Sequence, residues 1–329
     1  MQYQEQKVSL NPRWNLLSHL THKEWWYTGI SDEKQKLYIG ISVIRTKCID
    51  SIDISVYFAD KAPKGKDSGG HWEHAVFLGY LKCGSDKNKL DVSVNADKKN
   101  PGFSFIYNDK KGDEKDSEAC DNKWNLSFHS SKKGCTMDGS FVIKQSIPRF
   151  IKQDNYFART YFLLHYFQNV VDGTLTINGK QYTISKGAGY QDHCYGNVPR
   201  KSKWHWIAVQ GEKCALASLM NYGPYSQCYT EAFFGKKPNK QGWVRLNQNV
   251  SFECYSDKHF DSEWKITSSD MELTCQILAF NNQNNIIPPV VNLKHYQCYV
   301  LVQGKVRVGG IWKQTGKMYG VLEEHYGTW

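Results

Sequence analysis

An acid and an imidazole lie side by side in the segment GAGYQDHCYG, residues 187–196, among glycines and tyrosines. They are Asp192 and His193, and Tyr190 lies two positions before the acid. Burial of a carboxylic acid in an apolar site raises its pKa, so that it can hold a proton near neutral pH and donate it to a substrate. The alternative is that Asp192 and His193 bond to backbone groups of a tight turn, a use that needs no catalysis.

Hydration of a carbon–carbon double bond is one reaction that such an acid could perform. The acid must protonate a carbon, and water must then capture the resulting cation. Both steps favour a dry cavity with aromatic walls, because the faces of aromatic rings stabilise a cation. The chain contains 11 Trp, 20 Tyr and 15 Phe, and such side chains often line ligand sites. The composition therefore favours a hydrophobic small molecule as the partner.

The elements that must position these groups are predicted to be β-strands. Apolar residues recur at every second position in short runs, which is typical of half-buried strands; the runs lie at 52–58, 90–94, 124–128, 204–208 and 273–277. Asn178-Gly179 separates two further alternating runs, as in a hairpin with a type I′ turn. Apolar spacing typical of a helix does not extend beyond two turns. The sequence predicts an all-β fold with antiparallel sheets, closed as barrels or sandwiches.

Length and charge limit the class of protein. The 329 residues suffice for two domains of ordinary size. The formal charge of +10 comes from lysines scattered among carboxylates rather than from a basic stripe, so we expect no nucleic-acid partner. No run approaches the ~18 apolar residues of a membrane span. Because the amino terminus lacks the apolar stretch of a signal peptide, we expect a cytoplasmic protein as the sequence stands, or a secreted one if a signal has been removed.

The cysteines and histidines do not form a recognisable metal or redox motif. The ten cysteines include no C-x-x-C pair, and we expect mostly free thiols. His74, His165, His193 and His205 are numerous enough for a metal site, but their spacing matches none of the common ligand patterns. The sequence shows no glycine-rich loop between a strand and a helix that could bind the phosphates of a nucleotide. We therefore expect neither a metal nor a cofactor, and the oligomeric state is left open.

Four motifs together resemble one protein family. They are HKEWWYTG (22–29), GYQDHCYG (189–196), WHWIAVQ (204–210) and YGVLEEHYG (319–327). Their order and rough spacing are similar to those of the family that includes carotenoid 1,2-hydratase (hydroxyneurosporene synthase), the AttH-like proteins and kievitone hydratase. The resemblance implies two antiparallel lipocalin-like β-barrel domains, at 1–186 and 187–329, with a ligand site at or between them.

The resemblance also implies roles for individual residues. Hydratases of the family use a Tyr-x-Asp pair and an upstream His-x-aromatic pair, which match Tyr190, Asp192, His165 and Phe167 here. We expect Asp192 to donate the proton, Tyr190 to orient the acid or the substrate, and His165 to hold the water or tune the acid. Phe167 replaces the tryptophan of the family.

Two further departures concern the acidic motif itself. Cys194 and Tyr195 stand where the family usually has Asn or Glu followed by Trp or Phe. An apolar aromatic has thus become a phenol, which favours a substrate that is smaller or more polar than a carotenoid.

A wider set of side chains is expected to contact the substrate. It consists of Trp25, Tyr27, His74, Phe167, His193, Tyr195, Trp204, Trp206 and Glu323. Strand alternation places Trp25 and Tyr27 on one face and Glu24 and Trp26 on the other, so core packing is the alternative role for at least one tryptophan. For His74 the alternative is a partly exposed strand, and for Glu323 a solvated chain end.

Three classes of function are consistent with these patterns. The first is a cofactor-independent enzyme that acts on an isoprenoid or polyketide-like molecule by acid-assisted hydration, isomerisation or cyclisation. The second uses the same scaffold for its shape alone, like the related fungal Diels–Alder cyclases, or for oxygenation of a bound molecule. The third is a lipocalin-like binder without catalysis. An acid that faces the ligand distinguishes the first class from the others, because a binder needs only apolar walls and a few polar groups.

Overall fold

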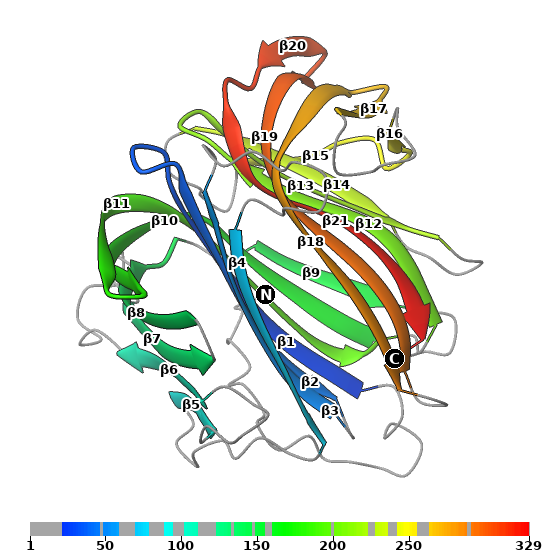
Figure 1. Cartoon of the computed structure of the whole chain (residues 1–329). Coiled ribbons are helices and arrows are strands. Elements are labelled where there is room, and N and C mark those ends of the chain that lie inside the picture. The colour runs from blue at the N-terminus through cyan, green and yellow to red at the C-terminus, as the bar shows by residue number, and fades with distance from the viewer. Residues whose placement is uncertain are drawn as a thin grey trace.

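All regular elements in the described part of the chain are β-strands. The computed structural model describes residues 22–46, 49–58, 70–78, 89–94, 102–110, 123–132, 135–146, 149–154, 160–198, 201–222, 228–235, 242–254, 263–287 and 291–328. These strands form two sheets, which lie against each other and each of which curls into a half-barrel (Figure 1). The predicted all-β fold with two antiparallel units is confirmed.

The first sheet is built from the first eleven strands. They are β1 (His22–Asp32), β2 (Leu37–Thr46), β3 (Ile49–Phe58), β4 (Gly70–Leu78), β5 (Lys89–Val94), β6 (Gly102–Lys110), β7 (Lys123–Lys132), β8 (Cys135–Lys144), β9 (Arg149–Asp154), β10 (Thr160–Ile177) and β11 (Lys180–Asn197). Their order is β4-β3-β2-β1-β11-β10-β8-β7-β6-β5, and β9 also pairs with β10. The two longest strands, β10 and β11, thus lie in the middle of the sheet.

The second sheet is built from the remaining strands. They are β12 (Lys201–Gln210), β13 (Cys214–Asn221), β14 (Tyr229–Phe234), β15 (Trp243–Arg245), β16 (Ser251–Cys254), β17 (Trp264–Ser268), β18 (Met271–Ile287), β19 (Val291–Val308), β20 (Ile311–Gln314) and β21 (Met318–Thr328). Their order is β15-β14-β13-β12-β21-β19-β18-β17-β16, and β20 pairs with β19. The chain passes from one sheet to the other between β11 and β12, and the division at residue 186 stays a prediction.

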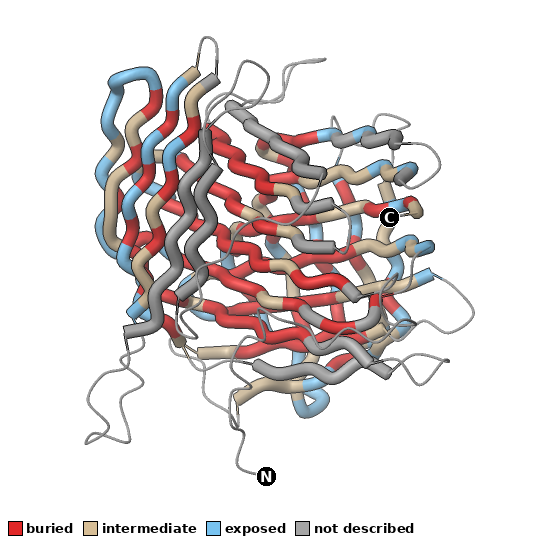
Figure 2. Tube along the Cα trace, turned by 90° about the horizontal axis from the view of Figure 1, so that it is seen from below, coloured by how far each residue is buried: buried red, intermediate tan, exposed pale blue. Residues whose placement is uncertain are grey.

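Three apolar clusters account for the core. One lies on the first sheet and includes Trp26 and Ile54; a second lies on the second sheet and includes Ile207 and Cys275. The third contains residues of both sheets, among them Tyr190 and Trp206, and fills the space between them. Strands that border two clusters are buried on both faces, whereas outer strands alternate between buried and exposed positions (Figure 2). The third cluster is where a functional site could draw on both halves of the chain.

The turn between β10 and β11 is the one that the sequence predicted. Asn178 and Gly179 both have positive φ, 48° and 80°, as a type I′ turn requires. The Asn178 side chain also accepts a hydrogen bond from the Thr136 backbone N–H over 2.8 Å. The hairpin prediction is therefore confirmed, and the turn is tied to the neighbouring strand β8.

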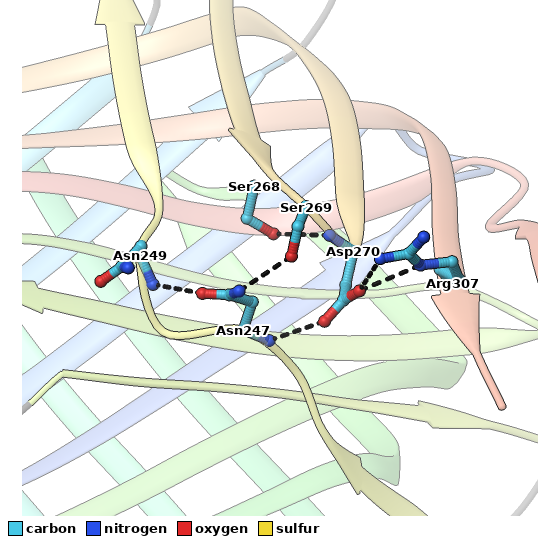
Figure 3. Close-up of polar contacts among 6 residues, drawn as sticks. All are labelled: Asn247, Asn249, Ser268, Ser269, Asp270 and Arg307. Atoms are coloured by element: carbon cyan, nitrogen blue, oxygen red, sulfur yellow. Dashed lines mark hydrogen bonds and ion pairs between the residues drawn. The ribbon is translucent and has the colours of Figure 1, made fainter. Parts of the chain in front are cut away.

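A polar network closes one end of the second sheet (Figure 3). Asp270, in the turn between β17 and β18, accepts hydrogen bonds from the Arg307 guanidinium at 2.8 and 3.1 Å and from the Asn247 backbone N–H at 3.0 Å. The Asn247 side chain in turn bonds to Ser269 and to the backbone of Asn249. One carboxylate thus joins β19 to the segment before β16.

The described cysteines are free thiols, as predicted. They are Cys135, Cys194, Cys214, Cys228, Cys254, Cys275 and Cys298; the other three lie outside the described residues. Cys214, Cys275 and Cys298 are buried in the core of the second sheet, where they pack as small hydrophobic side chains. Within the described ranges, no helix is long and apolar enough to cross a membrane.

Candidate functional site between the sheets

The register of β10 and β11 brings the two predicted catalytic pairs together. His165 on β10 lies directly opposite Asp192 on β11. Tyr190 is on the same face as Asp192, because side chains two positions apart share one face of a strand. The Tyr190 hydroxyl donates a hydrogen bond to Asp192 Oδ2 over 2.9 Å and lies 2.7 Å from His165 Nδ1. Three groups expected to act together are therefore in direct contact.

Two bulges, one on each strand, produce this register. One adds a residue to β11 between Ile184 and Gly187, and the other adds a residue to β10 between Tyr166 and Asn169. Each bulge includes a non-glycine residue with a φ of 55°, Lys186 in the first and Gln168 in the second. The two insertions cancel, so beyond them the strands return to the pairing set by the Asn178-Gly179 turn.

The bulge in β10 also connects the two sheets. The Gln168 side chain donates hydrogen bonds to the carbonyl oxygens of Gly211, at 3.0 Å, and Gly235, at 3.2 Å, both in the second half of the chain. Its backbone N–H donates to the Gln210 side chain. Because Gln168 is three positions from His165, these bonds hold the segment of β10 that carries His165 against the second sheet.

The second sheet contributes a residue that the sequence did not indicate. The Tyr229 hydroxyl, on β14, lies 3.0 Å from His165 Nε2 and is buried, with the residue 2% exposed. Both ring nitrogens of His165 are therefore hydrogen-bonded to tyrosines, one from each sheet. Tyr229 begins the short segment YTEAFF, which shows no polar motif and could not have been assigned to the site from sequence.

The electrostatic environment of Asp192 favours its protonated form. The pKa of Asp192 is raised to about 8, first by burial and then by the nearby charge of Glu323, and these effects outweigh the lowering by the hydrogen bond from Tyr190 and by the Trp25 indole. Asp192 Oδ1 is buried and has no hydrogen-bond partner of ordinary geometry within the described residues, although the Trp25 indole lies close enough to the carboxyl to lower its pKa. A neutral acid with one unoccupied oxygen is what proton donation requires.

Aromatic rings surround the polar chain. Trp206 stacks on His165 with ring centroids 5.3 Å apart, and it lies 5.9 Å from the ring of Tyr229. Phe167 contacts Tyr190 at 4.6 Å and Trp243 at 5.2 Å. Phe167 and Trp206, two of the expected contact residues, therefore pack against Tyr190 and His165, and their contact with a substrate stays a prediction.

The EWWY segment of β1 divides its side chains between two clusters, as alternation predicted. Trp25 and Tyr27 belong to the cluster between the sheets, whereas Trp26 belongs to the core of the first sheet. Tyr27 lies opposite Asp192 in the β1–β11 ladder, and its ring centroid is 6.1 Å from that of Tyr190. Its hydroxyl bonds to that of Tyr38 over 2.5 Å.

His193 faces the opposite side of β11 from Asp192. Its Nε2 lies 2.9 Å from a carboxylate oxygen of Glu24, and its ring stacks on Trp26 at 4.9 Å. Asp192 and His193 are adjacent in sequence, but their side chains lie on opposite faces of the sheet. The His193 ring is therefore not next to the Asp192 carboxyl.

Trp204 and Glu323 lie beside the cluster on the second sheet. Trp204 stacks closely on His325, with centroids 3.5 Å apart, and burial, with the nearby charges of His295 and Lys23, lowers the pKa of His325 well below its usual value. Glu323 is paired with Trp206 in the β12–β21 ladder and accepts a hydrogen bond from the Gln297 side chain over 2.9 Å. Glu323 is partly exposed, so it lies at the edge of the buried site.

Two expected contact residues are described only by their backbone. His74 is in β4, opposite Asp53, and Tyr195 is in β11, opposite Glu24; their side chains lie outside the described part. Among the described side chains, no group of three or more His, Cys, Asp or Glu could hold a metal ion.

Comparisons with known proteins show which solved structures share this fold. No protein-family model and no curated protein matches the sequence. Among solved structures, an AttH protein from Nitrosomonas europaea is similar, with a TM-score of 0.61 and 12% identity over 93% of this chain and 92% of that one. Kievitone hydratase from Nectria haematococca also has a TM-score of 0.61, with 14% identity over 98% of this chain and 96% of that one. The protein therefore has the fold of AttH and kievitone hydratase, as the sequence motifs predicted.

Proposed function

We propose that the protein is an enzyme that protonates a hydrophobic small molecule from Asp192 and thereby catalyses hydration, isomerisation or cyclisation without a cofactor. The observation that carries the proposal is a buried carboxyl group, kept neutral by its surroundings, with Oδ1 unoccupied. The substrate class is an isoprenoid or polyketide-like alkene, which suits the aromatic surroundings of the acid. The hydratase with the same fold supports hydration as the first reaction to examine.

The reaction begins with transfer of the Asp192 proton to one alkene carbon. The π electrons form the new C–H bond, and the other carbon becomes a cation next to the aromatic rings of the site, among which Trp206 and Phe167 contact His165 and Tyr190. Water then forms a C–O bond, and its proton returns to the Asp192 carboxylate. Loss of a different C–H proton to the Asp192 carboxylate gives isomerisation instead. Attack by a second double bond forms a ring and a new cation, and loss of a proton from that cation to the same carboxylate completes cyclisation.

The polar neighbours of Asp192 have supporting roles in this scheme. The hydrogen bond from Tyr190 stabilises the carboxylate formed after proton transfer, and burial raises the pKa of Tyr190 well above its usual value, so that its hydroxyl keeps the proton it donates. Trp25, Tyr27 and the partly exposed Glu323 lie at the same cluster and are proposed to contact the substrate.

A binder without catalysis is the second candidate, because the same unoccupied oxygen could anchor a hydroxyl group of a ligand. The two candidates differ in whether hydrogen and oxygen atoms of water enter the ligand. Native mass spectrometry of the purified protein identifies molecules that remain bound. Those molecules, together with a panel of isoprenoid and polyketide alkenes, are then incubated with enzyme in water labelled with heavy oxygen and deuterium.

The enzyme proposal predicts protein-dependent incorporation of deuterium at carbon, and of heavy oxygen too if the reaction is hydration. Asp192→Asn should abolish this incorporation. Asp53→Asn, which changes another buried aspartate, is the matched control and should retain it. Tight binding without any incorporation, lost on Asp192→Asn, would favour the binder and contradict the enzyme.

A further inference from the structure

Three hydrogen bonds join the two halves of the chain in a single line. They run from Tyr229 on β14 to His165 on β10, from His165 to Tyr190 on β11, and from Tyr190 to Asp192. All four residues are buried, with relative exposures between 2% and 8%. Buried polar groups of this kind are placed by their partners rather than by water.

The last bond determines the proton positions along the whole line. Tyr190 has one hydroxyl proton, and it donates this proton to Asp192 Oδ2. The contact between Tyr190 and His165 Nδ1 must then be made by an Nδ1–H that donates to the tyrosine oxygen. A neutral imidazole has one N–H, so Nε2 is an acceptor, and the Tyr229 hydroxyl donates to it.

If the hydrogen bonds along this line ran in the opposite direction, the acid proton of Asp192 would lie on Oδ2 instead of Oδ1. If His165 carried its proton on Nε2, Tyr190 would donate to Nδ1 and could no longer donate to Asp192. The protonated Asp192 would then donate from Oδ2 to the Tyr190 oxygen, and Oδ1 would be the carbonyl oxygen. The acid proton would point into the hydrogen-bond chain, and none would be available at the unoccupied atom.

We propose that Tyr229 is a positioning residue that donates its hydroxyl proton to Nε2, stabilises the Nδ1–H tautomer of His165 and thereby helps to keep the acid proton of Asp192 on Oδ1. The assignment rests on the proposed function in one respect, since Oδ1 is useful as a donor only if Asp192 is the acid. The tautomer of His165 is independent of that proposal. The second sheet thus acts on the proton donor through two residues of the first.

The packing of Tyr229 suits this role. Its ring lies 6.1 Å from His165 and 5.9 Å from Trp206, between the two sheets. The next residue, Thr230, bonds through its hydroxyl to that of Ser218 on the neighbouring strand β13, over 2.9 Å. The hydroxyl of Tyr229 is therefore presented to His165 from a strand that is fixed on its own sheet.

Nitrogen NMR of isotope-labelled histidine tests the tautomer directly, because a protonated and an unprotonated ring nitrogen resonate far apart. His165→Gln identifies the signals of His165. We expect a protonated Nδ1 and an unprotonated Nε2 in the unmodified protein, and a loss of this preference in Tyr229→Phe, which removes one hydroxyl and keeps the ring. The matched control is Tyr222→Phe, because the Tyr222 hydroxyl bonds to His205 Nδ1 at 2.6 Å; it should alter His205 alone.

Three outcomes would overturn the inference. They are a protonated Nε2 in the unmodified protein, protonation of both nitrogens at neutral pH, and an unchanged tautomer in Tyr229→Phe. If Tyr229→Phe does not fold, the tautomer of the unmodified protein decides. The rate measurement is separate: Tyr229→Phe should lower kcat about 10-fold or more with little change in KM. An inactive protein with the expected tautomer would refute the proposed enzyme and leave the assignment of protons intact.

Discussion

His165 and Asp192 face each other directly in the ladder between β10 and β11, and Tyr190 connects their side chains. The pairing depends on two bulges that cancel. An insertion or deletion of one residue in either bulge would turn one of the two side chains to the other face of the sheet. The contact between His165 and Asp192 therefore depends directly on the register of these two strands.

Asp192→Asn keeps the size of the side chain and removes the acid. Turnover should fall by about 10²-fold or more, the usual scale for the loss of a general acid, whereas ligand affinity should change little. Steady-state kinetics and calorimetric binding with the substrate found by isotope incorporation provide the measurement. A fully active variant would exclude proton donation by Asp192 and favour catalysis by shape alone.

The pH dependence of stability should report the raised pKa of Asp192. The carboxyl keeps its proton up to about pH 8 in the folded protein, but it ionises near about 3.9 in the unfolded chain. Its contribution to stability is present below the lower value and is lost as the pH rises through the upper one. The free energy of unfolding should therefore fall with rising pH between these values, by up to about 1.4 kcal/mol per pH unit.

Chemical denaturation of the unmodified protein and of Asp192→Asn across this range measures the effect. The difference in slope between the two proteins isolates the contribution of Asp192. Parallel curves would show that the carboxyl is ionised in the folded protein, contrary to its proposed role.

His165→Ala should lower turnover by about 10- to 10²-fold, because it removes the group that orients Tyr190. His129→Ala is the matched control: His129 is an exposed histidine that lies 2.6 Å from Asp138, and its loss should leave turnover unchanged. Rates per folded molecule, corrected by circular dichroism, provide the comparison. Equal rates for the two variants would remove His165 from the mechanism.

Gln168 should stabilise the contact between the sheets at some cost in backbone strain. Its φ of 55° is unfavourable for a residue with a side chain, by about 1–2 kcal/mol, whereas glycine adopts it freely. Gln168→Ala loses the side-chain bonds and keeps the strain, and Gln168→Gly loses both. Thermal unfolding should therefore rank Gln168→Ala below Gln168→Gly. The reverse order would show that this bulge is not strained.

Asp270→Asn should lower stability at neutral pH by about 0.5–1 kcal/mol, the scale of a partly exposed ion pair. The bonds from Arg307 hold the pKa of Asp270 below its usual value. Its contribution is present above about pH 3.9 and is lost as the pH falls through the lowered pKa. Glu272→Gln, which alters the more exposed pair with Lys305, is the control and should have a smaller effect in urea unfolding.

Local sequence patterns were sufficient to predict much of the first sheet at the site. Asn178-Gly179 marks the turn, alternation marks the strands, and the motif around Asp192 indicates the candidate acid. The two bulges had no clear signal, because Lys186 and Gln168 adopt a positive φ only under the constraints of the surrounding strands. Because the two bulges cancel, His165 pairs with Asp192 as it would in a hairpin that had no bulges.

The contribution of the second sheet could not be predicted in the same way. Tyr229 reaches His165 through the packing of two sheets, and no spacing in the sequence encodes that contact. His193 illustrates the opposite case: adjacency to Asp192 suggested a joint role, but consecutive residues of a strand point to opposite faces. The sequence thus indicated the acid and its strand neighbours, and packing determined the remaining partner.

The passage from β11 to β12 has a consequence for how this protein could be divided. A single cut after Asn197 would leave the acid, its tyrosine and its histidine on one fragment and Tyr229 on the other. The amino-terminal fragment would carry every group that touches the proton, yet it would lack the hydroxyl that orients the imidazole. If the proposed function holds, full activity would return only when the two fragments reassemble, which makes this joint a natural place to build a split reporter.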